Sequence, residues 1–145
     1  MYQHILIPTD GSTLSRVAVQ QGAALAKALG ARITLVTVSA PYAAVSVEPL
    51  YVASTTEDYE KMVADVAQKV LDEGSAQVRA AGVACDTRHA VHAQPWQAII
   101  DAAQQNGCDL IAMASHGRSG LAAVVLGSET TKVLTHSRIP VLVYR

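Results

Sequence analysis

The chain has 145 residues, the length of one ordinary domain, so a second domain is not expected. Half of the residues are apolar, 16% are charged and the formal net charge is −1, which argues against a nucleic-acid-binding surface or an acidic tail. No stretch approaches the about 18 apolar residues of a membrane span, and the N-terminus lacks the basic segment of a signal peptide. We therefore expect a single soluble, cytoplasmic domain over residues 1–145, with neither nucleic-acid nor membrane partners.

The first two predicted elements are a buried strand and an amphipathic helix. The apolar run at residues 5–7 closes at Pro8 and leads into a turn. A helix is expected to begin at Ser12 or Thr13, either of which can cap it, and to end at Gly30 in a left-handed cap. The apolar residues predicted to share one face of this helix are Leu14, Val17, Ala18, Leu25, Ala28 and Leu29.

The middle of the chain predicts a strand, an irregular segment and a long helical region. Residues 31–39 read as the second strand. Residues 40–55 contain two prolines and no clean period, so we expect an irregular excursion there. From Thr56 to about Gly82 the pattern predicts one helix or a pair of helices. Its predicted apolar face consists of Tyr59, Met62, Val63, Val66 and Val70.

The second half of the chain alternates strands and helices. Residues 83–91 predict a third strand, and residues 94–107 a helix with a proline near its start and a glycine at its end. Residues 108–115 predict a fourth strand, residues 128–137 a short helix and residues 139–145 a fifth strand. The apolar stripe of the first of these helices consists of Trp96, Ile99, Ile100 and Ala103.

This alternation predicts βαβ units and an α/β fold with an open, doubly wound, five-stranded parallel sheet of the Rossmann-like type. Right-handed crossovers and a strand order that reverses beside the first strand would place a crevice at the carboxyl ends of strands one and four. Asp10, which follows the first strand, and the glycine loop after the fourth strand would both line this crevice. Alternatively, Asp10 only caps the first helix or organises the turn.

A glycine-rich loop leads into the last helix in the stretch ASHGRSGLAAVVLGSETT, residues 114–131. Its glycines are Gly117, Gly120 and Gly127. Such a loop offers backbone N–H groups and the positive end of a helix dipole, for which phosphate is the natural ligand. Ser128 and Thr130 add hydroxyl groups, and Arg118 and Lys132 add positive charge. The alternative is a merely flexible connection, with Ser128 capping its helix. Neither a Walker motif nor a dinucleotide-binding glycine motif occurs.

Metal and covalent chemistry have little support in the sequence. Cys85 and Cys108 lie in apolar segments and are expected to be reduced, buried thiols. The neighbouring His89 and His92 lack a third ligand, and no hydrolase motif is present. Because Asp10 is the only acidic residue that the strand pattern assigns to the crevice, ATP hydrolysis is expected to be slow if it occurs at all.

Three segments together resemble the universal stress protein family: ILIPTDGS near the N-terminus, ASHGRSGLAAVVLGS near the end and the closing IPVLVYR. The resemblance covers the whole chain in order and length, and it implies a sheet like that of the adenine nucleotide alpha hydrolases. Nucleotide-binding members carry the pattern G-x2-G-x9-G-[ST]. Gly117, Gly127 and Ser128 match this pattern, and Ala114 stands in place of its first glycine.

The resemblance implies that the site holds ATP, or AMP or ADP, with or without Mg²⁺. In this assignment Asp10 receives the ribose or adenine end of the ligand, Val38 meets the adenine through its backbone, and Met113 with Ala114 forms the floor. Phosphates would be held by Gly117, Gly127, Ser128 and Thr130. The full set of implied positions is Pro8, Thr9, Asp10, Val38, Met113, Ala114, His116, Gly117, Arg118, Gly120, Gly127, Ser128, Glu129 and Thr130.

Two of these positions have an open chemical role. We expect His116 either to contact phosphate or, as an ordinary loop residue, to be exposed to solvent. The carboxylate of Glu129 would repel a triphosphate unless it points to solvent or is offset by Arg118 or Lys132.

The leading hypothesis is a small ATP-binding stress-response or signalling module with little or no turnover, and therefore not an enzyme beyond a slow ATPase. The alternative is a nucleotide-free homodimeric interaction protein of the same fold. The family resemblance also implies a homodimer joined through the last strand, which would otherwise leave an exposed apolar edge. The residues expected at that interface are Val141, Leu142 and Val143.

Overall fold

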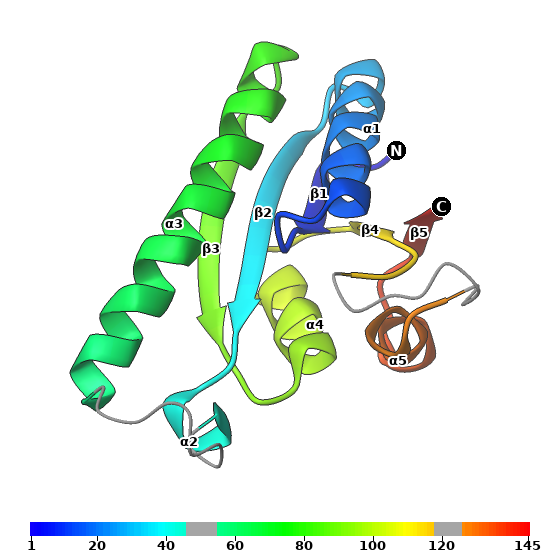
Figure 1. Ribbon diagram of the computed structural model, residues 1–145. Coiled ribbons are helices and arrows are strands. Elements are labelled where there is room, and N and C mark those ends of the chain that lie inside the picture. The colour runs from blue at the N-terminus through cyan, green and yellow to red at the C-terminus, as the bar shows by residue number, and fades with distance from the viewer. Residues whose placement is uncertain (46–54, 118–125) are drawn as a thin grey trace.

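A computed structural model describes residues 1–45, 55–117 and 126–145 as one α/β unit (Figure 1). The elements are β1 (His4–Pro8), α1 (Thr13–Leu29), β2 (Arg32–Ser39), α2 (Tyr42–Val45), α3 (Thr56–Ala80), β3 (Cys85–Val91), α4 (Pro95–Gln105), β4 (Leu110–Ala114), α5 (Ser128–His136) and β5 (Val141–Tyr144). The strands form a 5-stranded sheet in the order β3-β2-β1-β4-β5, and every pair is parallel. This confirms the predicted open parallel sheet, whose order reverses beside β1.

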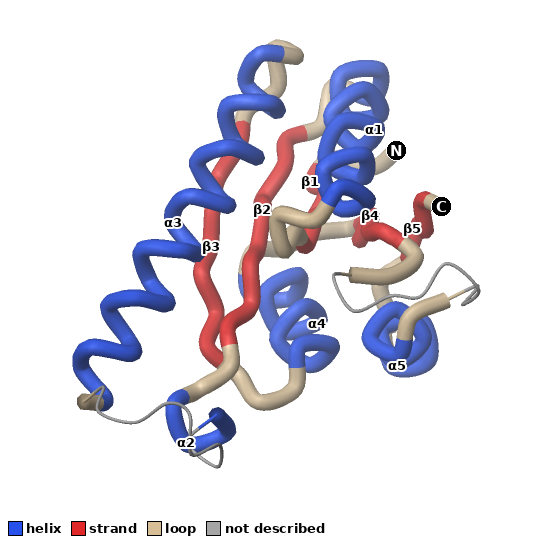
Figure 2. Tube along the Cα trace, in the orientation of Figure 1, coloured by secondary structure: helices blue, strands red, loops and turns tan. Residues whose placement is uncertain are grey.

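Helices cover both faces of the sheet, as Figure 2 shows. Ile5 and Ile7 of β1 point into an apolar cluster with α1 and α3, whereas Leu6 points into a second cluster with α4 and α5. The three side chains are fully buried because successive residues of a strand face opposite sides of the sheet. A strand covered on both sides explains the uninterrupted apolar run.

The bounds of α1 agree with the prediction, and Ala18 is buried as expected, but most of the predicted face is not buried. Ser12 is the N-cap, with its side chain accepting a hydrogen bond from the Ser15 N–H, and Gly30 forms the left-handed C-cap at φ 68°. Val17 and Leu29, expected on the buried face, are each 37% exposed. Small residues face the sheet instead, which lets the helix approach closely. They are Ser15, Ala18, Val19, Gly22, Ala23 and Ala26.

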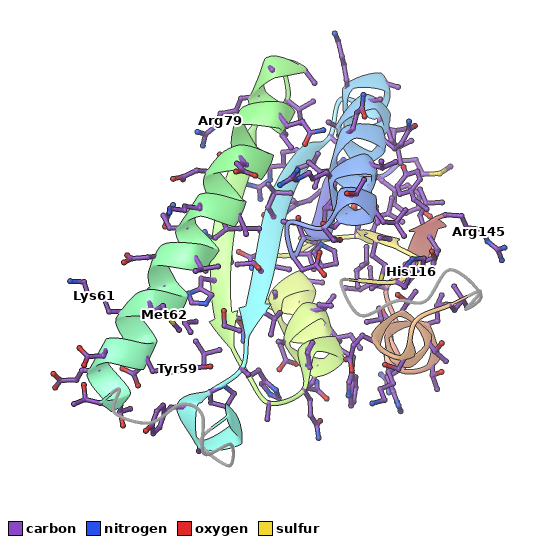
Figure 3. All side chains as sticks on the ribbon, in the orientation of Figure 1. Tyr59, Lys61, Met62, Arg79, His116 and Arg145 are labelled. Atoms are coloured by element: carbon purple, nitrogen blue, oxygen red, sulfur yellow. The ribbon has the colours of Figure 1, made fainter. Side chains whose placement is uncertain are left out.

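A single helix, α3, fills the region in which one or two helices were predicted. Tyr59 is buried as expected, and its hydroxyl donates to the Ala40 carbonyl at 2.9 Å. Met62 and Val66 were predicted to be buried but are 52% and 51% exposed, because the N-terminal turns of α3 extend past the strand ends (Figures 1 and 3). The buried face lies mostly further along the helix and includes Ala67, Leu71, Gly74, Ser75 and Val78.

The segment predicted to be irregular contains the short helix α2, which is too brief to produce a recognisable period. The ring of Tyr42 in α2 packs edge-on against Tyr59 of α3, with ring centroids 5.4 Å apart. Residues 46–54, also within the predicted irregular segment, lie outside the described residues.

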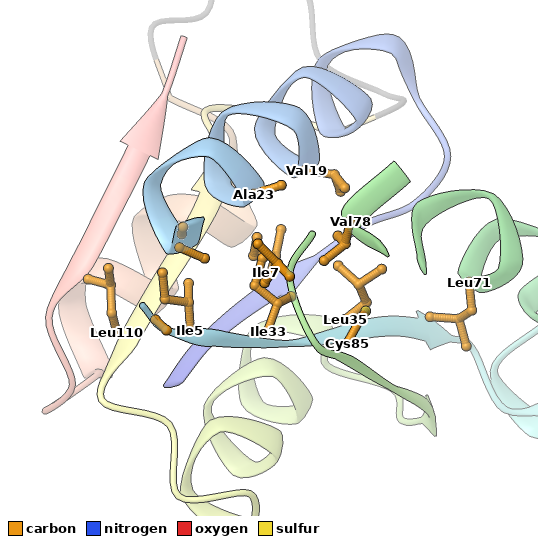
Figure 4. Packing of buried hydrophobic residues seen from close by; sticks show 14 residues of the cluster. Ile5, Ile7, Val19, Ala23, Ile33, Leu35, Leu71, Val78, Cys85 and Leu110 are labelled. Carbon is orange, nitrogen blue, oxygen red and sulfur yellow. The ribbon is translucent and has the colours of Figure 1, made fainter. Parts of the chain in front are cut away.

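The larger apolar cluster fills the space between the sheet and the pair α1 and α3, with α4 on the opposite side of the sheet (Figure 4). Ile7, Ile33, Leu35, Val19 and Val78 meet there and are at most 1% exposed. In the sheet, β1 lies between β2 and β4 and pairs with both. The carboxyl ends of β1 and β4 therefore lie next to each other at one edge of the core.

Candidate functional site

Asp10 lies in a tightly hydrogen-bonded turn directly after β1. Its Oδ1 accepts a hydrogen bond from the Ser12 N–H at 2.9 Å across Gly11, which adopts φ 77°. The neighbouring Thr9 is buried, and its Oγ1 lies 3.1 Å from Ser15 Oγ. Asp10 thus organises the turn, while Ser12 caps the helix. The carboxylate is held at the carboxyl end of the central strand.

Gly117, after β4, lies directly against this carboxylate. A Cβ added at Gly117 would sit 2.7 Å from Asp10 Oδ2, closer than side-chain carbons normally approach. The structure therefore brings together two residues that the sequence assigned to one crevice from opposite ends of the chain. A glycine at this position lets the backbone approach the acid without displacing it.

The start of α5 is bound back onto the end of β4. The Gly127 N–H donates to the Ser115 carbonyl at 2.6 Å, and the buried Thr130 hydroxyl donates to the Ala114 carbonyl at 3.0 Å. A Cβ at Gly127 would lie 3.1 Å from His116 Cα, so this second approach also favours glycine. The Thr130 hydroxyl, which was predicted to hold phosphate, is therefore engaged by the end of β4.

Gly127 occupies the N-cap position of α5 and supplies no side-chain hydrogen bond to the helix. Ser128 is the exposed first residue of α5, so it is not the helix cap considered as an alternative above. A helix start without a capping side chain leaves its first-turn N–H groups to water or to a ligand. Together with the helix dipole, these groups favour an anion.

Glu129 pairs with Lys132, one of the two cations expected to offset its charge, and it also forms a contact with Trp96 that the sequence did not predict. Its Oε2 accepts a hydrogen bond from the backbone N–H of Trp96 in α4 at 2.8 Å, and its Oε1 lies 3.8 Å from Lys132 Nζ. The N-cap of α4 is Gln94, which makes no side-chain capping bond, and Pro95 follows it. A helix start without Ser, Thr, Asp or Asn at its cap could have signalled that an acceptor comes from elsewhere.

The remaining predicted positions lie around the same strand ends. Met113 and Ala114 are buried at the end of β4, and the half-buried Val38 near the end of β2 packs against the cluster under α4. Pro8 ends β1 and is half-buried. His116, labelled in Figure 3, is half-buried, with Nδ1 3.2 Å from Ser115 Oγ. The predicted positions Arg118 and Gly120 lie outside the described residues.

An open groove of about 530 Å³ lies between β3 and α4, and no predicted site residue lines it. Several of its polar groups are engaged within the protein. Arg88 donates to the Thr87 carbonyl, the Asp101 carboxylate accepts from Gln97, and Asn106 donates to a carbonyl of α4. The groove is therefore a weaker candidate site than the crevice at Asp10.

The two cysteines are buried free thiols, as predicted. Burial raises the pKa of Cys108 to about 11 and also raises the pKa of Cys85, so neither supplies a thiolate nucleophile near neutral pH. Within residues 1–45, 55–117 and 126–145, no group of three or more His, Cys, Asp or Glu side chains is placed to hold a metal ion. No helix in that same part of the chain is long and apolar enough to cross a membrane.

Comparisons with known proteins agree with this fold. The universal stress protein family model matches residues 1–145. A universal stress protein of Thermus aquaticus, encoded in the QAH/OAS sulfhydrylase 3′ region, is 31% identical over 145 residues and covers 100% of both chains. The structure of MJ0577 from Methanocaldococcus jannaschii has a TM-score of 0.83 at 27% identity, covering 99% of this chain and 95% of that one.

A universal stress protein solved in complex with cAMP has a TM-score of 0.71 at 26% identity, covering 99% of this chain and 97% of the other. The similarity in sequence and in structure thus extends over the full length of the chain, or nearly so. The chain belongs to the universal stress protein family.

Proposed function

We propose that this protein binds an adenine nucleotide, ATP or else AMP or ADP, in the crevice at the carboxyl ends of β1 and β4. The observation that carries the proposal is the approach of the Gly117 backbone to the Asp10 carboxylate, beside the uncapped start of α5. One end of this crevice presents a hydrogen-bond acceptor and the other presents N–H donors. A nucleoside phosphate has the complementary arrangement of ribose hydroxyls and phosphate oxygens.

In the proposed complex, Asp10 accepts hydrogen bonds from the ribose hydroxyls, as acidic residues do in other nucleotide-binding α/β folds. Val38 and Met113 lie near the ends of β2 and β4, the strands on either side of β1, and contact the adenine. Gly117, Gly127 and Ser128 face the phosphates, and the predicted positions Arg118 and Gly120 lie outside the described residues. The cAMP complex of a 26% identical family member supports adenine recognition at such a fold.

Little or no turnover is expected from this set of residues. Hydrolysis of a phosphoanhydride needs a positioned water, a group to orient it and carboxylates or phosphates that hold Mg²⁺. Asp10 is assigned to the ribose, and Glu129 accepts a hydrogen bond from Trp96. We therefore propose a binding module, with any Mg²⁺ held mainly by the phosphates, acting in a cytoplasmic stress response.

The alternative of a nucleotide-free interaction protein rests on Ala114 and Glu129. The contact of Glu129 with Trp96 weakens the argument from Glu129, because its carboxylate is engaged by α4. Ala114 contributes its carbonyl to Thr130 through the backbone, which any residue can do. Mass spectrometry of the natively purified protein distinguishes the two functions by whether a nucleotide accompanies the chain.

Gly117→Val tests the nucleotide site directly. The new side chain would begin 2.7 Å from Asp10 Oδ2 and displace it, so ATP affinity should fall by at least about tenfold, the equivalent of roughly one charge-assisted hydrogen bond. Isothermal titration calorimetry measures the change. The matched control is Gly30→Asn, which keeps a left-handed cap far from the site and should leave the affinity unchanged. Undetectable ATP binding by the wild type, or equal affinity in Gly117→Val, would contradict the proposal.

We also propose that two copies associate through β5. Within the described chain, β5 pairs with β4 on one side and forms an edge of the sheet. Leu142 is 37% exposed there, and an apolar edge of this kind favours pairing with a second strand. The proposed contact residues are Val141, Leu142 and Val143.

The opposite edge of the sheet, β3, is protected against such pairing. The Ala84 carbonyl bonds to β2, so the backbone groups of Cys85 and Thr87 in the alternate positions face outward. Their carbonyls accept hydrogen bonds from Arg79 at 3.1 Å and Arg88 at 2.8 Å, respectively. Charged side chains over an edge strand discourage association, which leaves β5 as the edge better suited to a partner.

A further inference from the structure

Trp96 contacts α5 near both of its ends. Its backbone N–H donates to Glu129 in the first turn of α5, and its ring stacks on His136 in the last turn, with centroids 4.6 Å apart and an interplanar angle of 29°. Trp96, at the start of α4, therefore contacts both the first and the last turn of α5. The nucleotide motif does not include this connection.

The need for this contact arises at the start of α4. Pro95 has no N–H, and the N-cap Gln94 makes no side-chain hydrogen bond, so the Trp96 N–H is an orphan donor of the first turn. Glu129 satisfies it from another helix, and the negative charge suits the positive end of the α4 dipole. The same carboxylate is thereby committed to α4.

We propose that Glu129 is a positioning residue for phosphate binding. By holding the first turn of α5 against α4, it fixes where the backbone from Ser128 onward presents its N–H groups. The contacts of Gly127 with Ser115 and of Thr130 with Ala114 hold the same turn from the β4 side. This role rests on the proposed nucleotide function and assigns Glu129 to the phosphate-bearing part of the ligand, not to the adenosine part.

Two substitutions separate positioning from simple repulsion. Glu129→Ala removes the acceptor and should weaken ATP binding by about tenfold while leaving adenosine binding unchanged. Glu129→Gln keeps a carbonyl acceptor without the charge and should restore ATP binding to at least the wild-type level. Calorimetry with ATP and with adenosine measures both. If Glu129 merely repelled phosphate, both variants would bind ATP more tightly than the wild type, and that result would overturn the proposal.

A second readout does not depend on the ligand. Amide hydrogen exchange followed by NMR should show the Trp96 N–H protected in the wild type and in Glu129→Gln, and faster to exchange in Glu129→Ala. Glu60→Ala, an exposed acid on α3, is the matched control and should change neither measurement. Equal exchange at Trp96 in all the proteins would overturn the contact itself. Failure of the wild type to bind ATP would overturn the proposed function. The exchange rate of the Trp96 N–H would then still test whether Glu129 holds α5 against α4.

Discussion

His4 is a titratable side chain buried at the start of β1. It is 5% exposed, and its Nε2 lies 2.7 Å from Thr34 Oγ1 on the neighbouring strand. Burial, followed by the positive charge of Arg32, lowers the pKa of His4 below its usual 6.5. The neutral imidazole is therefore the form that the fold accommodates.

The stability of the protein should fall on mild acidification. Because folded His4 binds a proton more weakly than unfolded His4, its contribution is complete above pH 6.5 and is lost as the pH falls below it. The free energy of unfolding should drop by at most about 1.4 kcal/mol per pH unit for this one group. Urea unfolding of the wild type and His4→Gln at pH 7 and pH 5 measures the difference.

The loss between these two pH values should be smaller in His4→Gln. It should not disappear, because burial also lowers the pKa of His89. The pKa of Asp109, whose carboxylate accepts from the His4 N–H, is lowered from 3.8 and lies outside this window. An equal pH dependence in the two proteins would show that His4 does not carry the effect.

Individual site residues differ in how far the sequence could predict them. Asp10 after the first strand and the glycines before the last helix follow local patterns, and the structure brings Asp10 and Gly117 together. The acceptor role of Glu129 is not local, because it depends on an uncapped helix start at Pro95 that folding places nearby. Tertiary contacts of this kind leave no periodic or spacing signal.

At the level of elements, the bounds of α1 and α3 follow from caps and periodicity, but the buried faces follow only in part, with Ala18 and Tyr59 buried as predicted. The prediction favoured the most apolar residues, whereas α1 buries Gly22 and small neighbours against the sheet. A Cβ at Gly22 would clash with the Cδ1 of the fully buried Ile7. Close helix–sheet packing thus outweighs hydrophobicity in deciding which stripe faces inward.

Gly22→Val should destabilise the protein by about 1–3 kcal/mol, because the added groups overpack the core around Ile7. Ala24→Val is the matched control on the exposed side of the same helix and should cost only about 0.5 kcal/mol through helix propensity. Urea unfolding at neutral pH compares the two. Equal destabilisation would mean that α1 does not pack through its small residues.

At the level of the whole molecule, the βα alternation was sufficient to predict a parallel sheet with its reversal beside β1. What the alternation could not predict is which edge of the sheet is protected. That depends on Arg79 and Arg88 reaching the backbone of β3, whereas β5 exposes Leu142.

Leu142→Lys should therefore convert the proposed dimer to a monomer, because a charge on β5 opposes strand pairing. Val91→Lys places the same charge at the end of β3, where Val91 is 58% exposed, and should leave the dimer intact. Light scattering at micromolar concentration measures the masses. A wild-type mass near the 15.2 kDa of one chain would contradict association through β5.

The pairing of β1 with β4 joins segments roughly a hundred residues apart. During synthesis β1 and its neighbour β2 emerge early, whereas β4, the other partner of β1, exists only once residues 110–114 have been made. The acid that follows β1 can therefore meet the glycine loop only when folding is nearly finished. A nucleotide bound there would be selective for the completed fold, and it would stabilise that state without rescuing partly made chains.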